Sequence, residues 1–131
     1  PSLVGSEMCI RDRVSVGDIP PQKRIVDIGP ETLKGFAEKL RGCRTVFWNG
    51  PMGIFEIPQF GEGTRAVAQL LASLEGAVTI IGGGSTAEVV TEMGLADRMT
   101  FVSTGGGASL RFLGGEALPG VDVLGNRGSP A

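Results

Sequence analysis

Two runs of three glycines stand where an apolar segment gives way to a helix-like pattern. The first lies within TIIGGGSTAEVV (79–90), and the second lies within FVSTGGGASLRFL (101–113). Glycine has no Cβ, so such a turn lets backbone N–H groups converge on a ligand, and the helix behind it adds partial positive charge. Two such turns favour phosphate binding. The alternative is that they are tight turns needed only to pack a helix on a strand.

A third turn, WNGPMGIFE (48–56), also follows an apolar segment. Asn49 and Pro51 are typical turn residues, and Ile54 belongs to an apolar stretch that offers a wall to a nucleotide base. Glu56 is able to accept hydrogen bonds from ribose hydroxyls, but taken alone it is better explained as a solvated surface carboxylate. Neither glycine triplet matches GxxxxGK[ST] or GxGxxG, which argues against an ordinary P-loop or dinucleotide fold.

A parallel sheet would bring these turns to one edge, because ligands bind beyond the carboxyl ends of parallel strands. Apolar segments predict strands at residues 24–28, 45–48, 77–81 and 99–103, buried on both faces. Helical periodicity and stop signals predict helices from Pro30 to near Gly42, at residues 64–74, at residues 85–94, and from Ala108 onward. Strand and helix alternate, so the sequence predicts a parallel α/β sheet.

The composition excludes several classes of protein. The chain has 131 residues, 41% of them hydrophobic, and a net charge of −2 without a basic run, so we expect no nucleic-acid partner. No apolar run is long enough to span a bilayer. Cys9 and Cys43 form no CxxC pair, and a reducing cytoplasm is expected. Histidine is absent, so chemistry must rest on other groups.

The first thirteen residues, PSLVGSEMCIRDR, fit none of the predicted elements. We expect residues 1–13 to be a non-native leader and residues 14–131 to be the functional portion; the alternative is a native strand that leads into the fold.

The motifs NGPMGIFE, IIGGGSTAEVV and STGGGASLRFLGGEALPGV, with IVDIGPETL upstream, resemble the carboxyl-terminal part of phosphoglycerate kinase. The resemblance implies a three-layer parallel sheet with flanking helices, part of a Rossmann-like nucleotide-binding domain. It also implies a cytoplasmic glycolytic enzyme, a monomer at full length. Such an enzyme transfers a phosphoryl group between ATP and 3-phosphoglycerate, with Mg²⁺ accompanying ATP or ADP.

The resemblance also implies roles for individual residues. Glu56 would meet the ribose, Pro51 and Ile54 would lie near the base, and Asn49 would belong to the same nucleotide site. Gly105 and Gly106 would receive the phosphoryl group in flight. The nucleotide phosphates would meet Gly82, Gly83, Gly84, Ser85 and Thr86. No residue is assigned as a direct metal ligand.

Two departures from the family qualify these roles. The family often has aspartate where Ser85 stands, and the run Ser85-Thr86-Ala87-Glu88 reads as a capping box. Capping is therefore the favoured role of Ser85, with phosphate or water-mediated Mg²⁺ contact secondary. The chain also lacks the amino-terminal domain that holds phosphoglycerate, so we expect it to be inactive alone. The rival functions are a non-catalytic nucleotide- or phosphate-binding module and a purely structural fragment.

Overall fold

A computed structural model describes residues 2–7 and 10–124 of the chain. Apart from β4, the elements up to residue 72 are β1 (Ser2–Glu7), β2 (Ile10–Ser15), η1 (Val16–Asp18), β3 (Arg24–Ile28), α1 (Pro30–Leu40), η2 (Pro58–Phe60) and α2 (Glu62–Ala72). The remaining elements are β4 (Thr45–Asn49), β5 (Val78–Gly82), α3 (Gly84–Glu92), η3 (Ala96–Arg98), β6 (Phe101–Ser103), α4 (Gly106–Leu113) and α5 (Pro119–Asp122). The strands make two three-stranded sheets.

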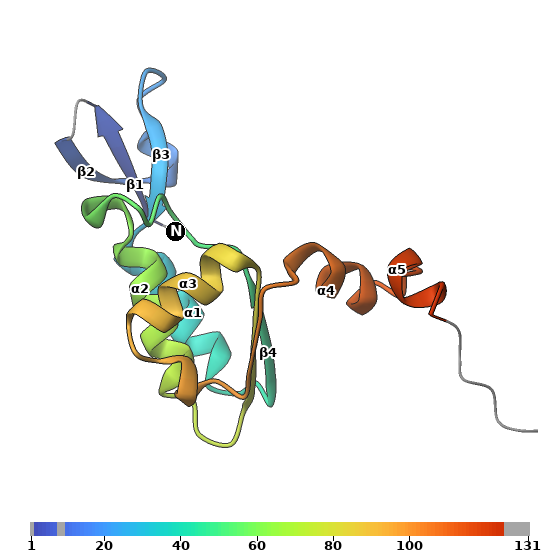
Figure 1. The fold of residues 1–131 in the computed structure, drawn as a ribbon. Helices are drawn as coiled ribbons and strands as arrows, with labels where there is room; N and C mark the ends of the chain where they lie inside the picture. Colours follow the sequence, from blue (N-terminus) through green and yellow to red (C-terminus); the bar gives the residue numbers. More distant parts are fainter. Residues whose placement is uncertain (1, 8–9, 125–131) are drawn as a thin grey trace, which may run out of the picture.

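The second sheet is the parallel sheet that the sequence predicts. Its strand order is β4-β5-β6, and each strand is joined to the next by a helix on the same side. Figure 1 shows α1, α2 and α3 together on one side of this sheet, with α4 and α5 on the other. The α/β class with a helix-flanked parallel sheet is therefore confirmed.

The predicted strand at residues 24–28 forms, but in the other sheet. It is β3, and it pairs antiparallel with β1, which in turn pairs antiparallel with β2. Its sequence RIVDI buries only Val26 and Asp27 fully, so it is not a strand covered on both faces. No strand pair is predicted in the first fifteen residues, where a native strand leading into the fold is only the alternative; β1 and β2 form there. The assignment of residues 1–13 to a leader remains a prediction, and residues 1, 8 and 9 lie outside the described ones.

The core lies between the parallel sheet and its three helices. Trp48 and Ile81 point from the sheet toward Val67 and Leu71 of α2 and Val90 of α3, and all five side chains are buried. Burying large apolar side chains in this way stabilises each by about 1.5–3 kcal/mol relative to exposure. Helix α1 lies at the margin of this core, where its Leu33 and Leu40 are half-buried and pack against it.

The opposite face of the sheet is less covered than expected. Phe47 and Ile80 are half-buried there, and Phe101 of β6 is 60% exposed. The expectation that these strands are buried on both faces is therefore wrong for this chain: α4 borders that face beside Phe47, Ile80 and Phe101 without closing it. Among the described residues, no helix combines the length and the apolar character needed to cross a membrane.

Candidate functional site

The carboxyl ends of the three parallel strands lie side by side in register. Asn49, the last residue of β4, is paired with Gly82 at the end of β5, and Gly82 is paired with Ser103 at the end of β6. The three turns singled out in the sequence leave the sheet from this row. Their assembly at one edge of the sheet, expected from parallel pairing, is thus present in the structure.

The two glycine turns approach each other closely beside the Asn49 side chain. A Cβ placed on Gly106 would lie 2.9 Å from Gly83 Cα, 3.2 Å from Gly83 N and 2.5 Å from Asn49 Oδ1. A Cβ on Gly82 would lie 3.0 Å from the same oxygen and 2.7 Å from Phe47 Cζ. Real Cβ atoms do not approach other atoms so closely, so the backbones meet here only because glycine occupies both turns.

Two helices begin at this meeting point. Gly83, with φ +91°, is the residue before α3, and Gly105 is the residue before α4. The free N–H groups of a helix's first turn carry partial positive charge and bind anions. Because α3 and α4 start from neighbouring strand ends, both helix starts lie at the same edge of the sheet, although at α4 the N–H of Gly106 already donates to Thr104 O at 3.1 Å. This arrangement suits an anionic ligand such as a phosphate chain.

Ser85 does not cap α3. The helix already begins at Gly84, its capping position is Gly83, and no side chain makes a capping hydrogen bond there. The capping-box interpretation is therefore wrong: glycine takes the capping position with a positive φ, so Ser85 lies within the helix, after that position. Gly84 and Ser85 are not enclosed by the protein, and a Cβ on Gly84 would meet no atom within 4 Å. Their outer side faces solvent.

Thr86 is oriented inward, unlike the residues just before it. Its side chain is 0% exposed, and its Oγ accepts a hydrogen bond of 2.9 Å from the backbone N–H of Gly50. The hydroxyl therefore joins the start of α3 to the turn after β4. Because the hydroxyl is buried and holds this hydrogen bond, the expected contact of Thr86 with a phosphate would come from the Thr86 backbone.

Two positions that matter for the site escape the sequence analysis. Thr64 of α2 is 0% exposed, and its Oγ accepts hydrogen bonds from the N–H groups of Met52 (3.1 Å) and Gly53 (3.3 Å). Asp27 of β3 is 1% exposed, and its carboxylate accepts from the N–H of Gly63, at 2.8 Å. A carboxylate inside the apolar run RIVDI is a visible signal of a buried structural role, since a buried charge needs partners. Thr64 gives no such signal.

The base-side residues lie further along the same loop. Pro51 and Ile54 line a shallow cavity of about 270 Å³ together with Val26 and Asp27 of β3. Ile54 is 43% exposed, and its backbone N–H donates to the Val26 carbonyl at 3.0 Å. Glu56 is exposed and does not line this cavity. The structure thus brings Asn49, the glycine turns and Thr86 together, with Pro51 and Ile54 on the adjoining loop and Glu56 beyond them.

The side chains at this edge offer few oxygen donors to a Mg²⁺ ion that arrives with a nucleotide. Within the described part of the chain, no three Asp, Glu, Cys or His side chains gather to hold a metal. Magnesium commonly keeps several waters and binds through substrate phosphates with few protein ligands. The exposed Ser85 hydroxyl at the start of α3 is a side chain here that could contact such a hydrated ion.

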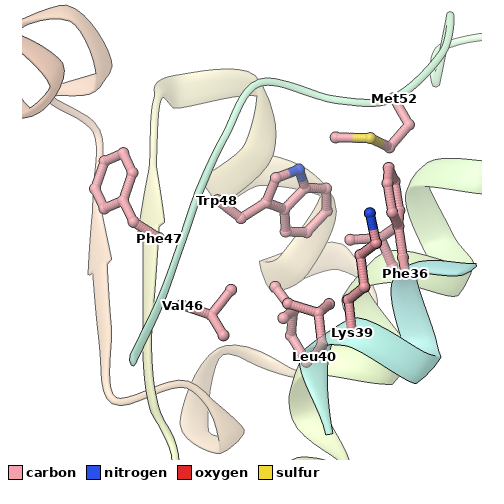
Figure 2. A pocket seen from close by; sticks show the side chains of 9 residues that line it. Phe36, Lys39, Leu40, Val46, Phe47, Trp48 and Met52 are labelled. Atoms are coloured by element: carbon pink, nitrogen blue, oxygen red, sulfur yellow. The ribbon is translucent and has the colours of Figure 1, made fainter. Parts of the chain in front are cut away.

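A second cavity lies away from the glycine turns. It has a volume of about 250 Å³ and lies between α1, β4 and α2. Figure 2 shows Trp48 and Val46 on one side of β4 facing Phe36 and Leu40 of α1, with Phe47 pointing to the other side. Apart from Lys39 its lining is apolar, so the cavity suits an apolar group better than a phosphate chain.

Comparison with known proteins agrees with the motifs. The family model described as Phosphoglycerate kinase matches residues 3–116. Phosphoglycerate kinase of Roseiflexus sp. (strain RS-1) is 56% identical over 111 residues, which is 85% of this chain and 28% of that protein. Phosphoglycerate kinase of Thermus thermophilus is 57% identical over 106 residues, covering 81% of this chain and 27% of that protein.

Solved structures show the same relationship in three dimensions. The phosphoglycerate kinase from Coxiella burnetii superposes with a TM-score of 0.83 at 36% identity, over 94% of this chain and 33% of that one. The enzyme from Pyrococcus horikoshii OT3 gives a TM-score of 0.82 at 32% identity, over 94% and 31% of the two chains. The chain thus spans less than a third of the length of the curated relatives named here. The family match over residues 3–116 and the shared fold establish that the chain belongs to the phosphoglycerate kinase family.

Proposed function

We propose that this chain supplies the phosphate-binding part of the nucleotide site in a phosphoglycerate kinase. The whole enzyme would transfer a phosphoryl group reversibly between ATP and 3-phosphoglycerate, as a cytoplasmic step of glycolysis. The observation that carries the proposal is the convergence of Gly83, Gly106 and Asn49 at the ends of neighbouring parallel strands. In a member of this family, such a convergence supports phosphate binding rather than packing alone.

Each part of the edge has a role in the proposal. The turn from Gly82 to Thr86 holds the phosphates of ATP or ADP through backbone N–H groups, with Asn49 beside it. Gly105 and Gly106 receive the phosphoryl group as it moves, assisted by the start of α4. The N–H groups of Gly105 and Gly106 donate to Ser103 Oγ and Thr104 O, each at 3.1 Å, so these glycines contribute a close backbone approach and the donors come from the helix starts. Preorganised donors stabilise the charge that develops in phosphoryl transfer, which depends on positioning more than on acid–base chemistry. Magnesium, when bound with the nucleotide, neutralises phosphate charge.

The base side is formed by the loop after β4. Pro51 and Ile54 contact the adenine, since they present apolar surface at the adjoining cavity. Glu56 hydrogen-bonds the ribose, because its exposed carboxylate is able to accept from hydroxyl groups. 3-Phosphoglycerate is bound by an amino-terminal domain of the whole enzyme, for which we propose a monomer.

For the isolated chain, a second candidate function is favoured by its length. It spans less than a third of its relatives, so we propose that alone it acts as a nucleotide-binding module without turnover. Much of the rate of a two-substrate reaction comes from holding both reactants in place, worth about 7–11 kcal/mol. Domain closure around them requires a second domain.

Isothermal titration calorimetry with MgADP tests the proposed site. Gly84→Val is informative because a Cβ at Gly84 would meet no protein atom within 4 Å, so the substitution should obstruct the ligand more than it disturbs the protein. We expect Gly84→Val and Glu56→Ala each to weaken MgADP binding. Glu75→Ala is the control, since Glu75 is exposed in the connection before β5, at the other end of the sheet. Unchanged affinity in both site variants would overturn the assignment.

A further inference from the structure

Two fully buried threonines from successive helices direct their hydroxyls at the same short loop. Thr86 of α3 accepts from Gly50 N–H, and Thr64 of α2 accepts from the N–H groups of Met52 and Gly53. Both threonines are 0% exposed. Three of the four residues from 50 to 53 therefore have their N–H groups bound by these two side chains; the fourth is Pro51, which has no N–H.

This loop connects the two halves of the proposed nucleotide site. It begins directly after Asn49, whose Oδ1 lies against the glycine turns and has no hydrogen-bond partner among the described residues. It ends at Ile54, which lines the base-side cavity and is bonded to Val26 of β3. The position of the loop therefore decides how far the phosphate side lies from the base side.

Local packing does not fix the turn at the start of the loop. Gly50 has φ +90°, and a Cβ on it would meet no atom within 4 Å. The N–H of Gly50 is instead held by Thr86, from the helix whose first turn would bind the phosphates. Removal of a hydroxyl would leave a partly buried backbone donor without its partner, and the loop would shift to find another.

We propose that the side-chain hydroxyls of Thr86 and Thr64 position the nucleotide site, acting through the loop and not on the ligand. Thr86 sets the Asn49–Gly50 turn against the start of α3, and Thr64 sets Met52 and Gly53 against the start of α2. Together they fix the spacing between the phosphate-binding turn and the base-binding loop for a nucleoside diphosphate or triphosphate. This inference rests on the proposed function.

A purely structural role for these hydroxyls is the competing explanation, and the chain offers a matched control. Thr79, near the start of β5, is 2% exposed, and its Oγ accepts from Thr100 N–H at 3.1 Å. It is a buried threonine that binds a backbone N–H, like Thr86, but it lies at the opposite end of the strand from Gly82. Thr79→Val thus removes an equivalent hydrogen bond away from the loop.

The test compares Thr86→Val, Thr64→Val, Thr79→Val and Thr86→Ser by calorimetry with MgADP and by thermal melting. We expect all three valine variants to melt earlier. Thr86→Val and Thr64→Val should weaken MgADP binding by about tenfold, whereas Thr79→Val keeps the wild-type affinity and Thr86→Ser restores most of it. Unchanged affinity in Thr86→Val and Thr64→Val, or an equal loss in Thr79→Val, would overturn the inference. If Thr86→Val does not fold, Thr86→Ala against Thr86→Ser decides the same question.

Amide hydrogen exchange in the chain without nucleotide separates this inference from the proposed function. We expect the Gly50 amide to exchange faster in Thr86→Ala than in Thr86→Ser, and the Thr79→Val variant to leave it unchanged. A wild-type chain that fails to bind MgADP would overturn the proposed function, and the positioning role with it. A wild-type chain that binds MgADP, with variants that bind equally well, would overturn the positioning role alone.

Discussion

Gly106 has no room for a side chain beside Gly83. A Cβ on Gly106 would lie 2.9 Å from Gly83 Cα and 2.5 Å from Asn49 Oδ1, so the turn after β6 and the turn after β5 are in backbone contact. Gly83 Cα belongs to the backbone, so it cannot swing aside as the end of a flexible side chain could. The contact holds two helix starts at one place, and it depends on glycine.

Gly106→Ala should therefore destabilise the fold. The added methyl must push the two turns apart, and overpacking of this kind costs about 1–3 kcal/mol. Gly107→Ala is the matched control, because a Cβ there meets no atom within 4 Å, and we expect no loss of stability from it. Urea unfolding monitored by circular dichroism gives both values. Equal stability in the two variants would show that the contact is looser than described.

Asp27 should contribute strongly to the stability of the fold. Its buried carboxylate accepts hydrogen bonds from Gly63 N–H and from Ile28 N–H, each at 2.8 Å. It also lies at the start of α2, where a negative charge is favourable. We expect Asp27→Ala to lower the free energy of unfolding by at least about 2 kcal/mol. The control is Asp97→Ala, because Asp97 is exposed, and it should change stability by less than about 0.5 kcal/mol. Similar losses in the two variants would contradict this account.

Ser85 should contribute little to stability, because Gly83 holds the capping position and Ser85 is exposed. Ser85→Ala should change the free energy of unfolding by less than about 0.5 kcal/mol. Ser85→Asp should raise it by about 0.3–1 kcal/mol, since it places a negative charge in the first turn of α3. Thermal melts of the three proteins decide this. A loss of about 1 kcal/mol in Ser85→Ala, typical of a removed cap, would restore the capping role.

The sequence is sufficient to predict the parallel sheet and the edge where the turns meet. Glycine triplets directly after apolar runs are costly unless a close approach requires them, and parallel pairing brings such turns together. The structure shows that close approach between Gly83 and Gly106. The family motifs surrounding these turns also indicate the relationship that the family match confirms.

Other features depend on distant partners and could not be read locally. The strand RIVDI contains nothing that shows its partner is β1 rather than the parallel sheet. The start of α3 is ambiguous by one or two residues in the sequence, because any of three consecutive glycines can precede a helix, and Gly83 alone of the three has a positive φ. The role of Thr64 emerges only when α2 is packed beside the loop after β4.

The isolated chain should not catalyse phosphoryl transfer. Its described residues provide the proposed nucleotide side, and orientation of the second substrate is where much of the rate arises. A coupled spectrophotometric assay of the purified 131-residue chain with MgATP and 3-phosphoglycerate should give the background rate. An intact phosphoglycerate kinase from one of the relatives is the positive control. Sustained turnover close to that of the control would show that the division of labour proposed here is wrong.

The most direct test of the central claim is a titration of the isotope-labelled chain with MgADP, followed by amide chemical shifts in two-dimensional NMR. The claim is that the turns after β4, β5 and β6 form one nucleotide site. It predicts that the largest changes in amide chemical shift fall on residues 49–56, 82–86 and 105–107. These changes should all saturate over the same range of MgADP concentration. Shifts confined to the apolar cavity lined by Trp48 and Phe36, or no saturable shifts in the three turns, would contradict it.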